Sequence, residues 1–172
     1  IKAFNELYYR VAGRSEVEQL VHYDPYFYPL DAIGGWNKLY GKAGFVQYQF
    51  VIPLSAGMEG LKEILEEISL SGKGSFLAVL KVFGDSNQNP LSFPMAGYTL
   101  ALDFKVEPEL FELLDRLDQK VLSLGGRHYL AKDARMSEEL FKATYADGLA
   151  DLQAIRAHYG VIDTFNSQQA YR

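Results

Sequence analysis

Residues 45–53, FVQYQFVIP, alternate between apolar and polar side chains and predict a β-strand with two different faces. The apolar face carries Val46, Tyr48, Phe50 and Ile52. Gln47 and Gln49 point to the opposite side, because strand side chains alternate with a period of two, and they lie about 6–7 Å apart at the rise of a strand. A buried amide without a hydrogen-bond partner costs about 1–3 kcal/mol, so this second face is expected to meet water, polar groups or a ligand.

The same patterns predict three more strands and five helices. Strands are expected at 75–83, 98–105 and 127–131, and helices at 1–12, 55–71, 108–124, 137–145 and 148–159. Residues 13–15 are expected to interrupt the chain after the first helix, and Ser55 to cap the second. The aromatic segment 23–31, with prolines at 25 and 29, is expected to be extended or turned, either as a loop held over the core by its rings or as a lining for an apolar or sugar-like ligand.

The order strand, helix, strand, strand, helix, strand is that of the ferredoxin-like split βαβ arrangement. The chain 1–172 is therefore expected to form a single α+β domain, a ferredoxin-like βαββαβ antiparallel sheet with both central helices on one face and further helices at its N- and C-terminal ends. In this topology the strand order is 4-1-3-2, with the first and third strands in the centre.

The face of the sheet opposite the helices, which we call the open face, gathers polar side chains. Its expected members are Gln47, Gln49, Thr99, Ala101 and Asp103, with Lys81 from an edge strand and Lys132 just beyond the other edge. This is more polarity than a second core layer tolerates, so it predicts one wall of a polar cleft. The alternatives are the ordinary wet face of an antiparallel sheet and, for Lys81, a guard against edge-to-edge aggregation.

Composition narrows the functional classes. A net charge of -5 with dispersed basic residues argues against a nucleic-acid partner, and no apolar run approaches the roughly 20 residues of a transmembrane helix. The absence of cysteine excludes disulfides, thiolate catalysis and Cys-ligated zinc, and the three dispersed histidines show no spacing typical of a metal site. Because the chain opens on Ile1 within a helical pattern, it is expected to be a piece of a longer protein.

Several long blocks carry a family resemblance. They are AFNELYYR at 3–10, YPLD at 28–31, WNKLYGKAGFVQYQFVIP at 36–53, SFLAVLKVFG at 75–84, NQNPLSFPMAGY at 87–98 and GGRHYLAKDAR at 125–135. On these blocks the chain resembles the C-terminal portion of FAD-dependent oxidases of the vanillyl-alcohol-oxidase type. Ordered blocks of this length are much more specific than a short motif.

The resemblance implies that the chain is a substrate-binding or cap domain whose open face lies against FAD. A separate N-terminal domain, absent here, would bind most of the FAD, and this chain alone would be inactive. The reaction implied is oxidation of a sugar alcohol to a ketone by hydride transfer to the flavin. The substrate implied is a sugar or lipid-linked sugar such as a polyprenyl-phosphoryl pentose, with a partner reductase as a further partner and a cytoplasmic location, membrane-associated through the lipid-linked substrate.

The resemblance also implies roles for individual residues. Lys132 would be the catalytic cation and the contact from the cap to the flavin, where an ammonium stabilises negative charge on the reduced ring. The substrate-binding residues implied are Gln47, Gln49, Lys81, Thr99, Ala101 and Tyr28, with Tyr28 over the entrance. The best-known members of the family carry Asn at the position of Thr99 and Cys at the position of Ala101. A reagent that requires the thiol of this cysteine is therefore not expected to react here. The competing interpretation is a non-catalytic ferredoxin-like domain that binds a small ligand or regulates another protein.

Overall fold

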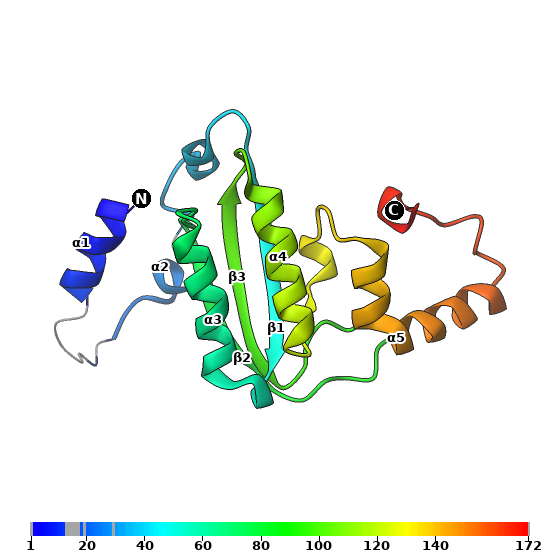
Figure 1. Ribbon diagram of the computed structural model, residues 1–172. Coiled ribbons are helices and arrows are strands. Elements are labelled where there is room, and N and C mark those ends of the chain that lie inside the picture. Colours follow the sequence, from blue (N-terminus) through cyan, green and yellow to red (C-terminus); the bar gives the residue numbers. More distant parts are fainter. Residues whose placement is uncertain (1, 13–17, 19, 29, 172) are drawn as a thin grey trace.

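The sheet is built around two long strands that the alternating pattern predicts. The computed structural model describes residues 2–12, 18, 20–28 and 30–171. In it, β1 (Phe45–Pro53) and β3 (Gly97–Lys105) are the central strands of a four-stranded antiparallel sheet with the order β2-β3-β1-β4. The edge strands are β2 (Ala78–Phe83) and β4 (Arg127–His128). The α+β class and the predicted strand order are confirmed (Figure 1).

The register between the strands decides which side chains meet on the open face. The pairs across β1 and β3 on this face are Gln47 with Asp103, Gln49 with Ala101 and Val51 with Thr99. On the other side of β3, Lys81 of β2 lies opposite Thr99. The polar residues of the two central strands therefore share one face, as their alternation predicts.

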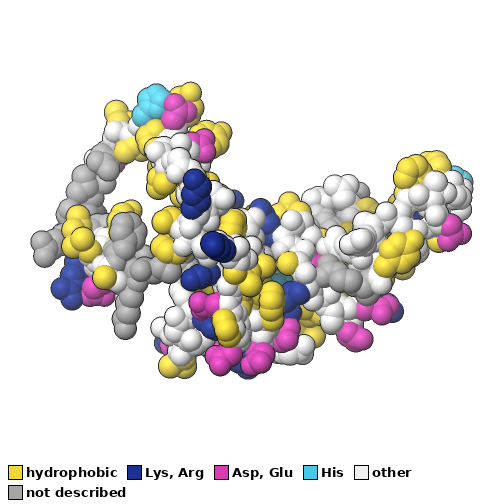
Figure 2. Space-filling view, turned by 90° about the horizontal axis from the view of Figure 1, so that it is seen from above, with side chains coloured by type: hydrophobic (Ala, Val, Ile, Leu, Met, Phe, Trp, Pro, Cys, Tyr) yellow, Lys and Arg dark blue, Asp and Glu magenta, His cyan; other side chains and the backbone are white. Residues whose placement is uncertain are grey.

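Helices α3 (Gly57–Leu70) and α4 (Leu110–Ser123) cover the other face of the sheet (Figure 1). Their apolar stripes and the apolar faces of β1 and β3 form one core. Its most deeply buried members include Phe50, Ile52, Leu61, Ile64, Leu110, Leu113, Leu117 and Val121. Truncation of a buried ring such as Phe50 to alanine would cost about 3–5 kcal/mol. The outer surface of α3 has an excess of acidic side chains, and Arg116 and Lys120 of α4 pair with Glu67 and Glu63 of this helix. Figure 2 shows acidic side chains along that side of the molecule.

The remaining elements are three further helices and four short turns. The helices are α1 (Lys2–Ala12), α2 (Tyr23–Phe27) and α5 (Glu138–His158), and the 3-10 turns are η1 (Trp36–Tyr40), η2 (Leu54–Ala56), η3 (Leu130–Lys132) and η4 (Gln168–Tyr171). The predicted first helix is confirmed, whereas the expected interruption at 13–15 lies outside the described residues. None of the helices in the described part of the chain has the length and apolar character that a bilayer crossing requires.

The expectation that residues 23–31 contain no helix is wrong, because α2 occupies 23–27. Pro25 is the third residue of this helix, where its missing N–H removes no helical hydrogen bond. The side chain of His22 caps the helix by accepting from the N–H of Asp24 at 3.3 Å. Pro29 lies outside the described residues.

Two further expectations about element starts are wrong. Ser55 does not cap α3, because it lies inside η2 and the helix begins at Gly57 without a side-chain cap. The strand expected at 75–83 begins only at Ala78. Before it, the hydroxyl of Ser75 donates to the carbonyl of Leu77 and accepts from the N–H of Asp103 at 2.9 Å. The same N–H also donates to the carbonyl of Leu77 at 3.3 Å, so the side chain shares this backbone donor with a backbone acceptor.

The C-terminal part of the chain follows the predicted order with different boundaries. The fourth strand ends at His128, and the chain then turns into η3 instead of continuing to residue 131. The two expected C-terminal helices are joined in α5, which is kinked at Tyr145 (φ -129, ψ 21). Ser137 caps the start of α5, since its hydroxyl accepts from the N–H of Leu140 at 3.2 Å.

Candidate functional site

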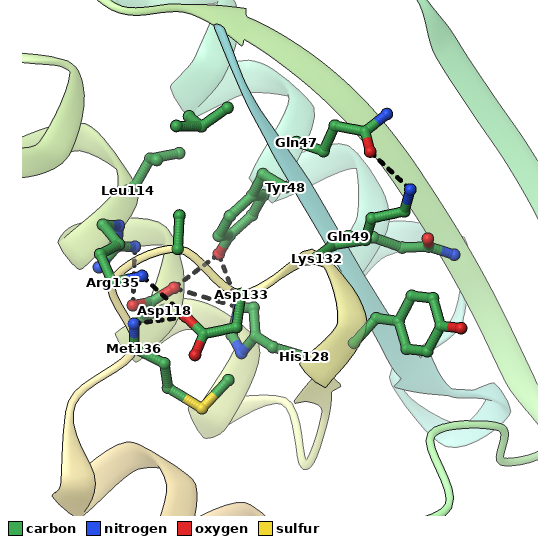
Figure 3. A pocket seen from close by; sticks show the side chains of 13 residues that line it. Gln47, Tyr48, Gln49, Leu114, Asp118, His128, Lys132, Asp133, Arg135 and Met136 are labelled. Atoms are coloured by element: carbon green, nitrogen blue, oxygen red, sulfur yellow. Dashed lines mark hydrogen bonds and ion pairs between the residues drawn. The ribbon is translucent and has the colours of Figure 1, made fainter. Parts of the chain in front are cut away.

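Lys132 and Gln47 are in direct contact at the edge of the open face. Lys132 lies at the end of η3, and its Nζ donates to Oε1 of Gln47 at 2.5 Å. Figure 3 shows the two side chains pointing toward one another from η3 and β1. Both are half-buried, so the ammonium and the amide share an environment that is only partly wet. The structure therefore brings together two of the residues that the sequence assigns to the site.

Asp103 holds the other end of the Gln47 amide. Nε2 of Gln47 donates to Oδ1 of Asp103 at 3.0 Å, and the hydroxyl of Tyr40 donates to Oδ2 at 3.4 Å. Asp103 is 3% exposed and Tyr40 is 1% exposed. Burial, and then the negative charge of Asp103, raise the pKa of Tyr40 to about 12, so its hydroxyl remains a proton donor at neutral pH.

The side-chain amide of Gln49 is held by a hydrogen bond to Thr99 on the neighbouring strand. Nε2 of Gln49 donates to Oγ1 of Thr99 at 3.2 Å, and that hydroxyl in turn donates to the backbone carbonyl of Phe50 at 2.8 Å. Thr99 has no exposed surface, whereas Gln49 and Ala101 beside it are half-buried. The structure thus places Thr99 where it orients Gln49, with its hydroxyl fully committed to other protein groups.

Lys81 and Tyr28 lie apart from this group. Lys81 is exposed on β2, and its ammonium has no ion pair among the described residues. Tyr28 follows α2 with 57% of its surface exposed, and no hydrogen bond or ring contact in the described part of the chain joins it to the sheet. The structure does not bring these two residues into contact with Lys132, Gln47 or Gln49.

Aromatic rings close both ends of the open face. At one end, Tyr40 stacks on Phe45 with ring centroids 4.4 Å apart and meets Phe76 edge-on. At the other end, Phe93 of the loop 84–96 is 5% exposed, stacks on Tyr129 and meets Phe83 of β2 edge-on. Gln47, Gln49 and Ala101 therefore lie between two groups of aromatic rings.

A second polar cluster lies on the helix side of β1, next to η3, and the sequence gives no direct sign of it. The hydroxyl of Tyr48 donates to Oδ1 of Asp118 at 2.9 Å and lies 2.8 Å from Nε2 of His128 (Figure 3). Arg135 binds the other oxygen of Asp118 at 2.8 Å. Burial, and then the charge of Asp118, raise the pKa of Tyr48 well above its usual value. The one available signal is Asp118 itself, an acid on the apolar stripe of α4.

A small cavity separates this cluster from the site residues. It measures about 30 Å³ and touches Gln47, Gln49 and Lys132 on one side and Asp118 and His128 on the other (Figure 3). This volume accommodates a water molecule but no organic ligand. Nδ1 of His128 is buried and has no hydrogen-bond partner among the described residues. The η3 turn that carries Lys132 lies between His128 and Arg135, and both of these side chains contact Asp118 of α4.

Comparisons with known proteins give two informative relatives. No model of a known protein family matches the chain. The chain is 32% identical over 145 residues to a Streptomyces coelicolor protein described as an uncharacterized protein in the mprA 5′ region, with 83% of this chain and 39% of the relative covered. It is 47% identical over 142 residues to decaprenylphosphoryl-β-D-ribose oxidase of Mycolicibacterium smegmatis, with 81% of this chain and 30% of the relative covered. The chain therefore spans less than half the length of these relatives. The resemblance predicted from the sequence blocks is confirmed, and the chain is homologous to a segment of decaprenylphosphoryl-β-D-ribose oxidase.

Proposed function

We propose that this chain is the substrate-binding domain of an FAD-dependent oxidoreductase that oxidises a sugar alcohol to a ketone. The observation that carries the proposal is the contact between Lys132 and Gln47 on the open face, beside Gln49, in a chain that is 47% identical to an oxidase. An ammonium and two oriented amides in a partly dry environment are suited to fixing hydroxyl groups and stabilising negative charge.

The substrate class is a lipid-linked sugar, such as a polyprenyl-phosphoryl pentose. The name of the M. smegmatis relative supports this class. Amide groups such as that of Gln49 can both donate hydrogen bonds to sugar hydroxyls and accept hydrogen bonds from them. The exposed ammonium of Lys81 lies on the same face of the sheet and would bind the phosphate of the substrate. Tyr28 does not contact these residues in the structure of this chain alone. We propose that it covers the entrance to the substrate site when the rest of the protein is present. A lipid-linked substrate would bring the protein to a membrane surface, and a partner reductase would reoxidise it.

The groups on the open face fit a bound flavin. The ammonium of Lys132 uses one of its N–H groups on Gln47, and its remaining N–H groups are suited to an acceptor that gains negative charge. A flavin, when bound, supplies the hydride acceptor. In this chain Lys132 contributes the positive charge, Gln47 keeps the ammonium in place, and Gln49, held by Thr99, orients the substrate. We propose that most FAD contacts come from a domain that precedes this chain.

The experiment that tests the proposal uses the full-length protein. It is purified, scanned for flavin absorbance and mixed anaerobically with a polyprenyl-phosphoryl pentose or with simpler sugar alcohols. Bleaching of the bound flavin by one of these supports the proposal and ranks the substrates. A protein that never carries flavin contradicts it, and leaves a non-catalytic domain that binds a small ligand.

A further inference from the structure

We infer that Asp103 is a positioning residue for Lys132, and that it acts through the side-chain amide of Gln47. The importance of this link for catalysis rests on the function proposed above. The link itself is a property of this chain and can be tested without flavin or substrate.

The link is a continuous chain of hydrogen bonds that crosses the open face. Lys132 donates to Oε1 of Gln47 at 2.5 Å, Nε2 of Gln47 donates to Oδ1 of Asp103 at 3.0 Å, and Tyr40 donates to Oδ2 of Asp103 at 3.4 Å. It joins η3, β1, β3 and η1, four elements that are distant in sequence. The ion pairs among the described residues include none between Lys132 and Asp103, so the amide of Gln47 is the connection.

The chemistry of Lys132, Gln47 and Asp103 fixes the direction of each hydrogen bond between them. An ionised carboxylate only accepts hydrogen bonds, and an ammonium only donates them. Asp103 therefore requires Gln47 to turn its Nε2 inward, which leaves Oε1 facing Lys132. A reversed amide would place its NH₂ against the ammonium and its oxygen against the carboxylate, and both contacts would be repulsive. Asp103 thus selects the end of Gln47 that Lys132 meets.

Asp103 is itself firmly held, as a positioning residue must be. It lies on the central strand β3, is 3% exposed, and its backbone N–H donates to Oγ of Ser75 at 2.9 Å. Both carboxylate oxygens have side-chain donors, from Gln47 and Tyr40. The raised pKa of Tyr40, caused first by its burial, keeps that second donor protonated at neutral pH. A carboxylate bonded on both sides cannot rotate away from Gln47 without leaving a buried polar group unpaired.

The test measures how accessible the Lys132 amine is to a reagent. The full chain is treated with formaldehyde and a mild borohydride under limiting conditions, and dimethylation of individual lysines is quantified by peptide mass spectrometry. Asp103→Asn removes the charge while keeping the shape, and Gln47→Leu removes the bridge while leaving Asp103 with Tyr40. Asp85→Asn, on an exposed loop, is the matched control, and Lys81, exposed on the same face, is the internal standard in every sample.

The expected result is a Lys132 labelling rate raised about fivefold or more in Asp103→Asn and Gln47→Leu. In Gln47→Leu the ammonium loses its acceptor, and in Asp103→Asn the amide of Gln47 is no longer fixed with Oε1 toward Lys132. Lys81 should be labelled at the wild-type rate throughout, and Asp85→Asn should behave as wild type. An unchanged Lys132 rate in both variants overturns the inference. If Asp103→Asn does not fold, Gln47→Leu alone decides by the same criteria. Failure here leaves the flavin experiment unaffected, so the two proposals can fail separately.

Discussion

The hydroxyl of Tyr48 lies 2.9 Å from Oδ1 of Asp118, so strand β1 and helix α4 are joined by a hydrogen bond inside an otherwise apolar core. Both side chains are buried, and Arg135 and His128 complete the cluster. A buried carboxylate at this position is tolerated only because each of its oxygens has a partner. Its role in stability can be measured directly.

Tyr48→Phe should lower the free energy of unfolding by about 1–2 kcal/mol, because Asp118 and His128 both lose a hydrogen-bond partner in the core. The measurement is a denaturant titration at neutral pH. Tyr159→Phe is the matched control, since Tyr159 is 72% exposed, and its effect should stay within about 0.5 kcal/mol. Equal effects of the two substitutions would show that the buried hydroxyl does not stabilise the fold.

Stability should fall between pH about 10 and about 12. The pKa of Tyr40 is raised to about 12 by burial and by the charge of Asp103, and that of Tyr145 to about 12 by burial. An unfolded chain releases these protons near pH 10, so in this interval the folded state binds more protons and is weakened as pH rises. Below pH about 10 both contributions are fully present.

Unfolding titrations at about pH 10, 11 and 12 would follow this loss, with a titration at about pH 8 as the reference below the interval. In Tyr40→Phe the decline should be shallower, and in Tyr40→Phe with Tyr145→Phe shallower again. An identical decline in all three proteins would contradict the assignment to these tyrosines.

A cysteine at position 101 should be modified by a thiol reagent, and a cysteine at position 99 should not. Ala101 is half-buried in the middle of the open face, whereas Thr99 has no exposed surface. The chain contains no cysteine, so the wild type gives no background. We expect Ala101→Cys to react at least about tenfold faster than Thr99→Cys, because only exposed thiolates react. Intact-mass spectrometry measures both rates, and comparable rates would show that position 99 is not buried beneath Gln49.

If Lys132 has the role proposed above, Lys132→Ala in the full-length protein should slow flavin reduction by substrate about a hundredfold or more, because the substitution removes the positive charge proposed to stabilise the reduced flavin. Lys81→Ala is the informative comparison. Lys81 lies on an edge strand, away from Lys132 and Gln47, so its loss should weaken substrate binding and leave reduction at saturating substrate largely intact. Stopped-flow absorbance separates the two effects. Reduction of the Lys132→Ala protein at the wild-type rate would remove Lys132 from the catalytic role.

Local patterns predict much of the fold because the decisive signals are periodic. Alternation in β1 and β3 and the apolar stripes of α3 and α4 suffice for the strand order and for the two faces of the sheet. α2 escapes prediction because a proline is equally compatible with a turn and with the first turn of a helix.

The site is predicted less completely, because its contacts join residues far apart in sequence. Gln47 and Lys132 can be assigned to one face by alternation and family resemblance, yet their direct contact depends on the turn at η3. Tyr40 reaches Asp103 across 63 positions, and Tyr48 reaches Asp118 across 70. No local sequence pattern predicts hydrogen bonds between residues so far apart. Thr99 shows the reverse problem, since its position on the open face is predictable but its burial beneath Gln49 is not.

The alternating side chains of β1 contribute to both the core and the site, so both depend on the same strand register. Phe50 is buried among the helices, while Gln47 and Gln49 on the same nine-residue strand face the other way. A deletion of one residue within 45–53 would turn amides into the core and rings onto the open face at once. Substitutions at the open-face positions of this strand can therefore change the surface and leave the core intact, whereas a change in the length of the strand would disrupt both.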